Sequence, residues 1–119
     1  MLYKMKAFLP TLKEKKRYLA IEILSQKNRK HSFTDVSKAI WASIQGFIGS
    51  LGAGNAGIWF VEDKWRQNVQ RGLIRVNNKF IDPLRASLSF IKKVDNDTVM
   101  VNSIGASGSI KKAEDKYLR

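Results

Sequence analysis

The sequence predicts an α+β fold whose elements follow one another in the order β-α-β-β-α-β. Three observations support this prediction: a strongly alternating first strand, two segments with helical periodicity, and two short strands joined by a turn between those helices. Right-handed crossovers would place both helices on one face of a four-stranded antiparallel sheet, as in a ferredoxin-like split β-α-β sandwich. The opposite face of the sheet would then remain open to a partner.

The first strand is expected at residues 17–25, within the stretch LKEKKRYLAIEILS at 12–25. Alternate residues of a strand face opposite sides, and both sides are largely apolar here: Leu19, Ile21 and Ile23 on one, and Tyr18, Ala20, Glu22 and Leu24 on the other. A strand that needs cover on both faces indicates a central position in the sheet. The basic residues before it indicate a polyanion docked at its start, and residues 1–11 read as an irregular arm.

Two helices follow from apolar spacings of three and four residues. Ser32 and Asp35 have the spacing of a helix N-terminal cap. The apolar residues behind this cap are Phe33, Val36, Ile40, Ile44, Phe47 and Leu51. The second helix carries Ile81, Leu84, Leu88 and Ile91. It is expected to start between residues 79 and 82, because Pro83 is tolerated in a first turn.

The remaining strands are expected at residues 58–62, 69–76 and 98–104, with a hairpin tip at 63–68. Residues 26–31 form a basic loop after the first strand. The last strand leads into a Gly/Ser stretch at 105–109 and a charged terminal segment at 111–119, which can form a short helix.

The charge balance of the chain favours anionic partners. In 119 residues there are 22 Lys and Arg against 10 Asp and Glu, a formal net charge of +12. The basic residues recur along the chain, so nucleic acid is the first candidate and an anionic membrane surface the second. The chain has no cysteine, which excludes disulfides and thiolate metal sites. No signal-peptide core or apolar run of membrane-spanning length is present, so a cytoplasmic location is expected.

None of the candidate catalytic motifs lies in the structural context that its chemistry requires. The sequence GAGNAG at 52–57 matches a dinucleotide-binding loop, but it follows a helix and opens a strand, the reverse of what that motif requires. His31 lies in a basic loop, where it is either satisfied or solvated and would serve phosphate sooner than catalysis. The paired carboxylates at 62–63, 95–97 and 114–115 are expected in turns or in the terminal segment, where they solvate the chain. No self-sufficient active site is predicted.

The aromatic residues argue against a reader that stacks RNA bases on its central strands. The strand at 71–76 has no aromatic residue, and Tyr18 stands alone on the first strand. Trp41, Trp59 and Trp65 are typical packing residues, although Trp65, at the expected hairpin tip, is a candidate for stacking. The prediction is therefore RNA contact through backbone and shape, with the open sheet face used for protein.

Two segments of the chain resemble signatures of the archaeal ribonuclease P protein component 2 family. They are PTLKEKKRYLA at 10–20 and GASGSIKK at 105–112, and AIW at 39–41 and GLIR at 72–75 are also similar. The resemblance covers nearly the whole chain, so residues 1–119 are expected to form one domain of this type. It implies a ferredoxin-like (RNA-recognition-motif-like) fold.

The same resemblance implies a function as a subunit of the ribonucleoprotein that removes the 5′ leader from precursor tRNA. In this family the catalytic RNA and its Mg²⁺ perform the cleavage, and the protein binds and stabilises the catalytic domain of the RNA. No cofactor or metal bound by the protein itself is implied, nor a membrane partner. The implied partners are ribonuclease P RNA, other ribonuclease P proteins, and protein component 3, in a heterodimer that can assemble as a dimer of heterodimers. Precursor tRNA would be contacted indirectly.

Carried onto this sequence, the resemblance assigns RNA contacts to basic residues of the matching segments: Lys13, Lys15, Lys16, Arg17, Arg75, Lys111 and Lys112. Their role would be to neutralise RNA phosphates. Tyr18, Leu24 and Tyr117 are the candidates for contact with a protein partner. Residues 107–109 would either offer backbone N–H groups to a phosphate or partner chain, or form a glycine-rich end to the last strand.

Two other functions remain open at this point. The first is a ribosomal or other assembly protein that scaffolds structured RNA without a catalytic role. The second is a stand-alone enzyme similar to acylphosphatase, with an Arg and an Asn holding a phosphoryl group.

Overall fold

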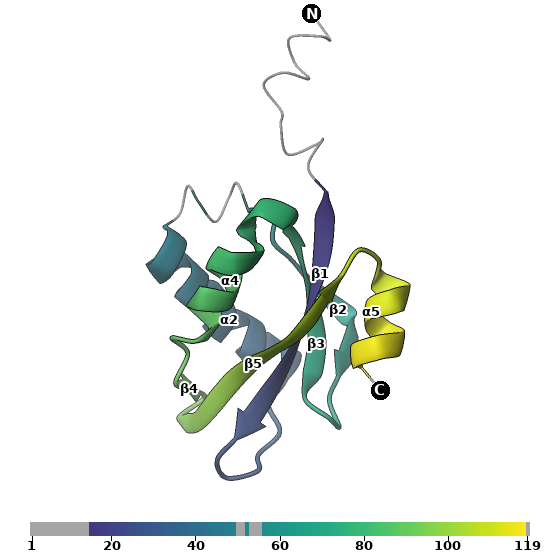
Figure 1. Cartoon of the computed structure of the whole chain (residues 1–119). Helices are drawn as coiled ribbons and strands as arrows, with labels where there is room; N and C mark the ends of the chain where they lie inside the picture. The colour runs from purple at the N-terminus through teal and green to yellow at the C-terminus, as the bar shows by residue number, and fades with distance from the viewer. Residues whose placement is uncertain (1–14, 50–51, 53–55, 119) are drawn as a thin grey trace, which may run out of the picture.

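A computed structural model describes residues 15–49, 52 and 56–118 of the chain. Its elements are β1 (Lys16–Ser25), α2 (Phe33–Ile48), β2 (Trp59–Arg66), β3 (Arg71–Asn77), the 3₁₀ helix η2 (Asn78–Phe80), α4 (Ile81–Leu88), β4 (Lys93–Val94), β5 (Asp97–Ser107) and α5 (Ile110–Tyr117). The strands form one antiparallel sheet in the order β2-β3-β1-β5-β4 (Figure 1). The predicted α+β class and strand–helix order are confirmed, whereas the predicted four-stranded sheet is wrong.

The fifth strand is β4, which has two residues and pairs with the start of β5. Such a short strand has no alternation for a sequence pattern to detect, because its existence depends on its partner strand. The arm expected at residues 1–11 and half of the glycine-rich connection at 52–57 lie outside the described residues.

The central position of β1 is confirmed, since it pairs with β3 on one side and β5 on the other. Its alternation also holds: Leu19, Ile21 and Ile23 face the larger core, while Tyr18 and Ala20 face the smaller one. The register with β5 shifts between Ala20 and Ile21, where β5 contains one extra residue. Such a bulge changes the face on which the later residues of a strand lie.

The larger core lies between the sheet and the helices α2 and α4 (Figure 1). α2 begins as predicted: Ser32 Oγ accepts a hydrogen bond from the backbone N–H of Asp35 over 3.2 Å. α4 begins at Ile81 and so places Pro83 in its first turn. The buried helical residues are Val36, Ile40 and Ile44 of α2 and Leu84 and Leu88 of α4. None of the helices in the described ranges has the length and apolarity that a membrane crossing requires.

The two predicted helices, α2 and α4, share one face of the sheet as expected, whereas α5 packs against the opposite face, which was expected to remain open (Figure 1). Its Ala113 and the following Leu118 are buried with Ala20, Val61 and Leu73 of the sheet. The charged terminal segment thus forms a helix, as its sequence allows. The sheet face that was expected to be free is therefore partly covered by this chain itself.

The β2–β3 hairpin is longer than predicted. β2 continues to Arg66, and the tip is the turn at residues 67–70, where Gln70 has a positive φ of 54°. Trp65 therefore lies inside β2 rather than at the tip. A β-carbon placed at Gly72 would lie 2.7 Å from Trp65 Cε3, so the indole covers the backbone of β3 at a position where only glycine fits.

Candidate nucleic-acid interface

The first part of the candidate interface is the start of β1, which carries Lys15, Lys16 and Arg17. Lys15 is exposed. Arg17 Nε donates a hydrogen bond to Asn78 Oδ1 over 3.2 Å, and Lys16 Nζ donates one to Asn77 Oδ1. Because Asn77 and Asn78 lie where β3 runs into η2, these bonds hold two of the cations at one edge of the fold.

The end of β5 lies beside this start of β1. Antiparallel pairing places Ser107 opposite Tyr18. A β-carbon placed at Gly108 would lie 3.1 Å from Arg17 Nη1, so the Gly/Ser stretch passes directly along the Arg17 side chain. Two segments at opposite ends of the sequence therefore meet in space.

The first turn of α5 adds two more cations to this end of the sheet. Lys111 and Lys112 are both exposed. The backbone N–H of Lys112 donates to Ser109 Oγ over 3.2 Å, so Ser109 caps the helix. β5 runs through Ser107. The Gly/Ser stretch is thus the end of the last strand, and its contact with a phosphate or a partner chain stays a prediction.

Arg75 joins the group through β3. It pairs with Tyr18 on β1 and with Trp59 on β2, and residues directly opposite on neighbouring strands share a face. Its guanidinium carbon lies 5.8 Å from the centroid of the Trp59 ring. The Nε atom of Arg75 is buried and has no hydrogen-bond partner among the described residues.

The structure thus gathers six of the predicted RNA-binding residues at one end of the sheet: Lys15, Lys16, Arg17, Arg75, Lys111 and Lys112. The seventh, Lys13, lies outside the described residues. In the described part of the chain, the side chains of Lys15, Lys111 and Lys112 have neither a hydrogen-bond nor an ion-pair partner. Each is a mobile point charge that can neutralise a phosphate, so this basic end of the sheet suits a polyanion.

The predicted partner-binding residues do not form one surface. Tyr18 and Tyr117 are half-buried in the smaller core, where a β-carbon at Gly105 would lie 2.5 Å from the Tyr117 hydroxyl oxygen. Leu24 lies at the far end of β1 and is 45% exposed. Leu24 is thus the exposed member of the predicted set, and it pairs with Met100 of β5, which was not predicted and is 63% exposed.

Of the two interpretations of His31, the satisfied side chain is confirmed and the solvated one is wrong, because the side chain is buried at the end of the sheet opposite to the basic end. Its Nε2 lies 2.8 Å from Oδ2 of Asp97, which also accepts a hydrogen bond from Ser25 Oγ. The backbone N–H of His31 donates to Gln70 Oε1 over 2.8 Å. This network ties the 26–32 loop to the hairpin tip and to β5.

Asp97 likewise departs from the expectation that the paired carboxylates are solvated. Its side chain is fully buried. The hydrogen bond from Ser25, together with that from His31, lowers the pKa of the Asp97 carboxyl below its ordinary value. The role supported by these contacts is structural. Among the described residues no group of His, Asp and Glu is arranged to hold a metal ion.

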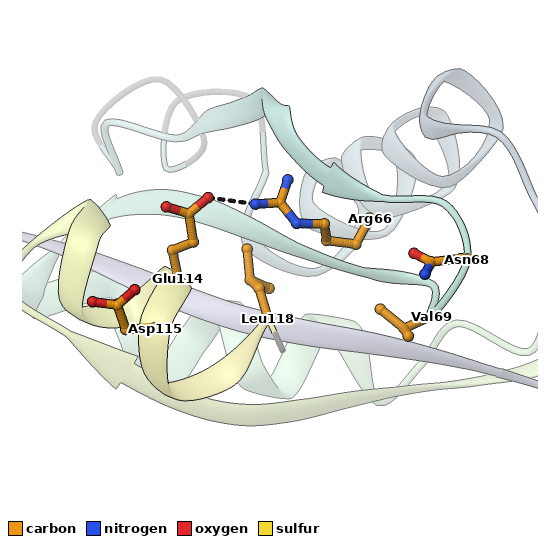
Figure 2. A pocket seen from close by; sticks show the side chains of 6 residues that line it. All are labelled: Arg66, Asn68, Val69, Glu114, Asp115 and Leu118. Carbon is orange, nitrogen blue, oxygen red and sulfur yellow. Dashed lines mark hydrogen bonds and ion pairs between the residues drawn. The ribbon is translucent and has the colours of Figure 1, made fainter.

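Glu114 connects α5 to the β2 strand. Its Oε2 accepts from Lys64 Nζ over 3.1 Å and from Arg66, the contact drawn in Figure 2. The hydrogen bond from Lys64 is the main cause of the lowered pKa of the Glu114 carboxyl. Beneath this contact, Leu118 points toward the sheet in a hollow between the helix and the hairpin (Figure 2). α5, and with it Lys111 and Lys112, is held in place by these contacts.

Trp59 is the exposed tryptophan of the described chain, and the expectation that it packs is wrong. It is 62% exposed, whereas Trp65 and Trp41 are half-buried in edge-on contacts with Phe33 and Phe60. The alternation of side chains in Trp59-Phe60-Val61 could have predicted that Trp59 and Phe60 lie on opposite faces of the sheet. It turns Phe60 toward the helices and leaves Trp59 on the opposite face.

Comparisons with known proteins agree with this geometry. A family model described as the Rpp14/Pop5 family matches residues 17–118. Ribonuclease P protein component 2 of Thermococcus kodakarensis is 31% identical over 109 residues, which cover 92% of this chain and 88% of that protein. The protein of the same name from Pyrococcus horikoshii is 30% identical over 120 residues, covering 99% and 95%.

A solved structure has the same fold. One chain in the cryo-EM structure of yeast ribonuclease MRP superimposes with a TM-score of 0.63 at 16% identity, over 88% of this chain and 86% of that one. The match to the family model begins at Arg17 and includes Arg75, Lys111 and Lys112 of the basic end of the sheet. The chain belongs to the Rpp14/Pop5 family.

Proposed function

We propose that this chain is a protein subunit of ribonuclease P, the ribonucleoprotein that removes the 5′ leader from precursor tRNA. The observation that carries the proposal is the convergence of six basic residues at one end of the sheet, in a chain that belongs to the Rpp14/Pop5 family. Its similarity to ribonuclease P protein component 2 over more than nine-tenths of its length supports the same assignment.

The proposed role of the subunit is to bind and stabilise the catalytic domain of the RNA, while the RNA and its Mg²⁺ perform the cleavage. Lys15, Lys111 and Lys112 offer their ammonium groups to phosphates where RNA strands crowd together. The two carboxylates with shifted pKa values, Asp97 and Glu114, are engaged in contacts that hold the fold together. The three exposed lysines are not engaged in this way, and the chemistry for which they are suited is the neutralisation of phosphates.

The proposal includes a protein partner, ribonuclease P protein component 3, in a heterodimer that can pair with a second copy. Other ribonuclease P proteins complete the complex, and precursor tRNA is contacted through it. The exposed pair of Leu24 and Met100 is the candidate contact, since it presents apolar surface away from the basic end. A cytoplasmic location follows from the proposed role in tRNA maturation.

The direct test is precursor-tRNA cleavage by the cognate RNA at modest Mg²⁺, with and without this protein and component 3. Cleavage is expected with the pair, and none with the protein alone. If the pair leaves the rate and the Mg²⁺ requirement of the RNA unchanged, the chain is a general assembly protein for structured RNA instead.

A second test asks whether the basic end of the sheet is the RNA contact. The variant K15Q/K111Q/K112Q should lower the salt dependence of RNA binding by up to three phosphate contacts, each worth about 0.7–0.9 in the log–log slope. K27Q/K92Q/K93Q is the matched control, because it removes three exposed lysines at the opposite end of the sheet. Equal slopes for the two variants would remove the basic end from the interface.

A further inference from the structure

Trp59 exposes a large aromatic surface at a free edge of the sheet. It is the first residue of β2, and β2 is an outer strand that pairs with β3 alone. An indole left 62% exposed forgoes the free energy that burial would supply. This chain buries most of the surface of its other two tryptophans, so the exposure of Trp59 calls for an explanation outside its own fold.

The cross-strand register links Trp59 to the basic end of the sheet. Trp59, Arg75, Tyr18 and Ser107 are successive partners across β2, β3, β1 and β5, so all four belong to one row on the face that also carries α5. α5 covers the next row, which contains Val61, Leu73, Ala20 and Gly105. Trp59 is thus the end of a row that leads directly to the RNA-binding residues proposed above.

Arg75 makes this row suited to a nucleotide. Its guanidinium is within cation–π distance of the Trp59 ring, at 5.8 Å from the centroid. Arg75 is only partly buried, its side chain makes no hydrogen bond or ion pair with the described residues, and its terminal nitrogens, unlike its Nε, are not among the buried atoms. A nucleotide supplies a partner for each side chain: a base whose π-face stacks on an aromatic ring, and a phosphate whose oxygens accept from the terminal N–H groups of a guanidinium.

We propose that Trp59 stacks one unpaired RNA base and that Arg75 binds the phosphate of the same strand segment. The inference rests on the proposed function, because the RNA is the one bound at the basic end of the sheet. The surrounding charge favours RNA over a protein as the occupant: Lys16 and Arg17 lie at the same end, and the chain carries a net charge of +12. Trp59 therefore adds a contact with an unpaired base to an interface that otherwise neutralises RNA phosphates.

The test uses the full-length protein and a fluorescein-labelled single-stranded decaadenylate, compared with the same strand in a duplex. W59A is expected to weaken binding of the single strand by about 5- to 150-fold, the range that corresponds to loss of one stacked base. The duplex affinity should not change. W59F should retain most of the affinity, since a phenyl ring also stacks. F90A is the matched control, because Phe90 is an aromatic residue of similar exposure, 61%, on another part of the surface.

Salt dependence separates the roles of the two residues. W59A should leave the slope of binding against salt unchanged, because stacking releases no counterions, whereas R75Q should lower it by about 0.7 for a single strand. A loss of affinity for W59A no larger than that for F90A would overturn the proposal. So would unchanged single-strand binding together with weaker assembly with component 3, which would make Trp59 a protein contact.

The two variants distinguish failure of the stacking site from failure of the proposed function. If RNA binding by K15Q/K111Q/K112Q has a reduced salt slope while W59A binds the single strand normally, the ribonuclease P assignment is supported and the stacking site is excluded. If neither variant differs from its control, the RNA interface itself is wrongly placed.

Discussion

The two faces of the sheet are held by different forces. On the face covered by α2 and α4, fourteen buried apolar residues of the described chain form one continuous cluster. On the face covered by α5, the corresponding cluster has five, and ion pairs between the helix and β2 supplement it. Burial of apolar surface involves no charge that salt can screen or pH can titrate, whereas partly exposed ion pairs respond to both.

This difference indicates that the two faces have different roles. The apolar face makes the fold, and the charged face positions the candidate interface, because α5 carries Lys111 and Lys112. Arg71 of β3 connects the sheet to α5. Its Nε donates to Glu22 over 3.0 Å, and its Nη1 donates to the carbonyl oxygen of Tyr117 over 3.2 Å. Removal of α5 contacts should therefore affect RNA binding before it affects the fold.

The largest effect is expected from the apolar face. Ile40 of α2 is almost completely buried in the larger core, so I40A should lower the free energy of unfolding by about 2–5 kcal/mol. L118A, in the smaller core, should cost less in urea denaturation and act mainly by exposing the amides of α5 to hydrogen exchange. If L118A lowers the denaturation midpoint as much as I40A does, the two faces are equally important for the fold.

A smaller effect is expected where Tyr117 lies on Gly105. The added methyl group of G105A would overlap the tyrosine ring, and the variant should lose about 1–3 kcal/mol of stability. In Y117A the ring is absent, so the same glycine substitution should cost little. A double-mutant cycle measures this coupling from four denaturation curves. Additive costs would show that the ring does not restrict position 105.

The smallest effect, and the most selective, concerns Glu114. The pKa of its carboxyl is lowered in the folded state, so its contribution is complete above its ordinary value of 4.5 and is lost as the pH falls through the folded-state pKa. Hydrogen exchange should therefore show α5 opening below pH 4.5, and also in high salt, while α2 stays protected.

E114Q is the control for this prediction, since it removes the titrating group and leaves a side chain of similar shape. Its α5 should be less protected at neutral pH, and the additional loss below pH 4.5 should vanish. If α5 of E114Q still opens in acid as in the parent chain, another group controls its docking. Asp97 also has a lowered pKa, but it lies between β1, β5 and the 26–32 loop, away from α5.

Local signals account for the parts of the fold that the sequence predicted. Ser32 caps α2 through an atom three residues away, and the alternation of Leu19, Ile21 and Ile23 reports burial directly. The basic segments at both ends of the chain were also visible as charge. Their meeting in space was not predicted, because it depends on the pairing of β1 with β5.

The parts that the sequence did not predict depend on contacts between distant residues. β4 exists because β5 pairs with it, and the charge-rich α5 is placed by two buried residues, Ala113 and Leu118. His31 and Asp97 meet although 66 positions separate them. The exposure of Trp59 follows from the position of α5, which covers the neighbouring row and stops short of this one.

The extra residue of β5 between the partners of Ala20 and Ile21 has a consequence for how such chains can vary in length. The extra residue is Ile104, and if it paired instead of bulging it would stand opposite Ala20, which would move Gly105 opposite Leu19 and leave a gap in the larger core. Deletion of Ile104 would remove the bulge and keep the pairs of Ala20 with Gly105 and of Leu19 with Ala106. A single-residue gain or loss elsewhere in β5 would exchange the two faces for the residues beyond it, so relatives should place such changes at this bulge, in the 26–32 loop or at the hairpin tip.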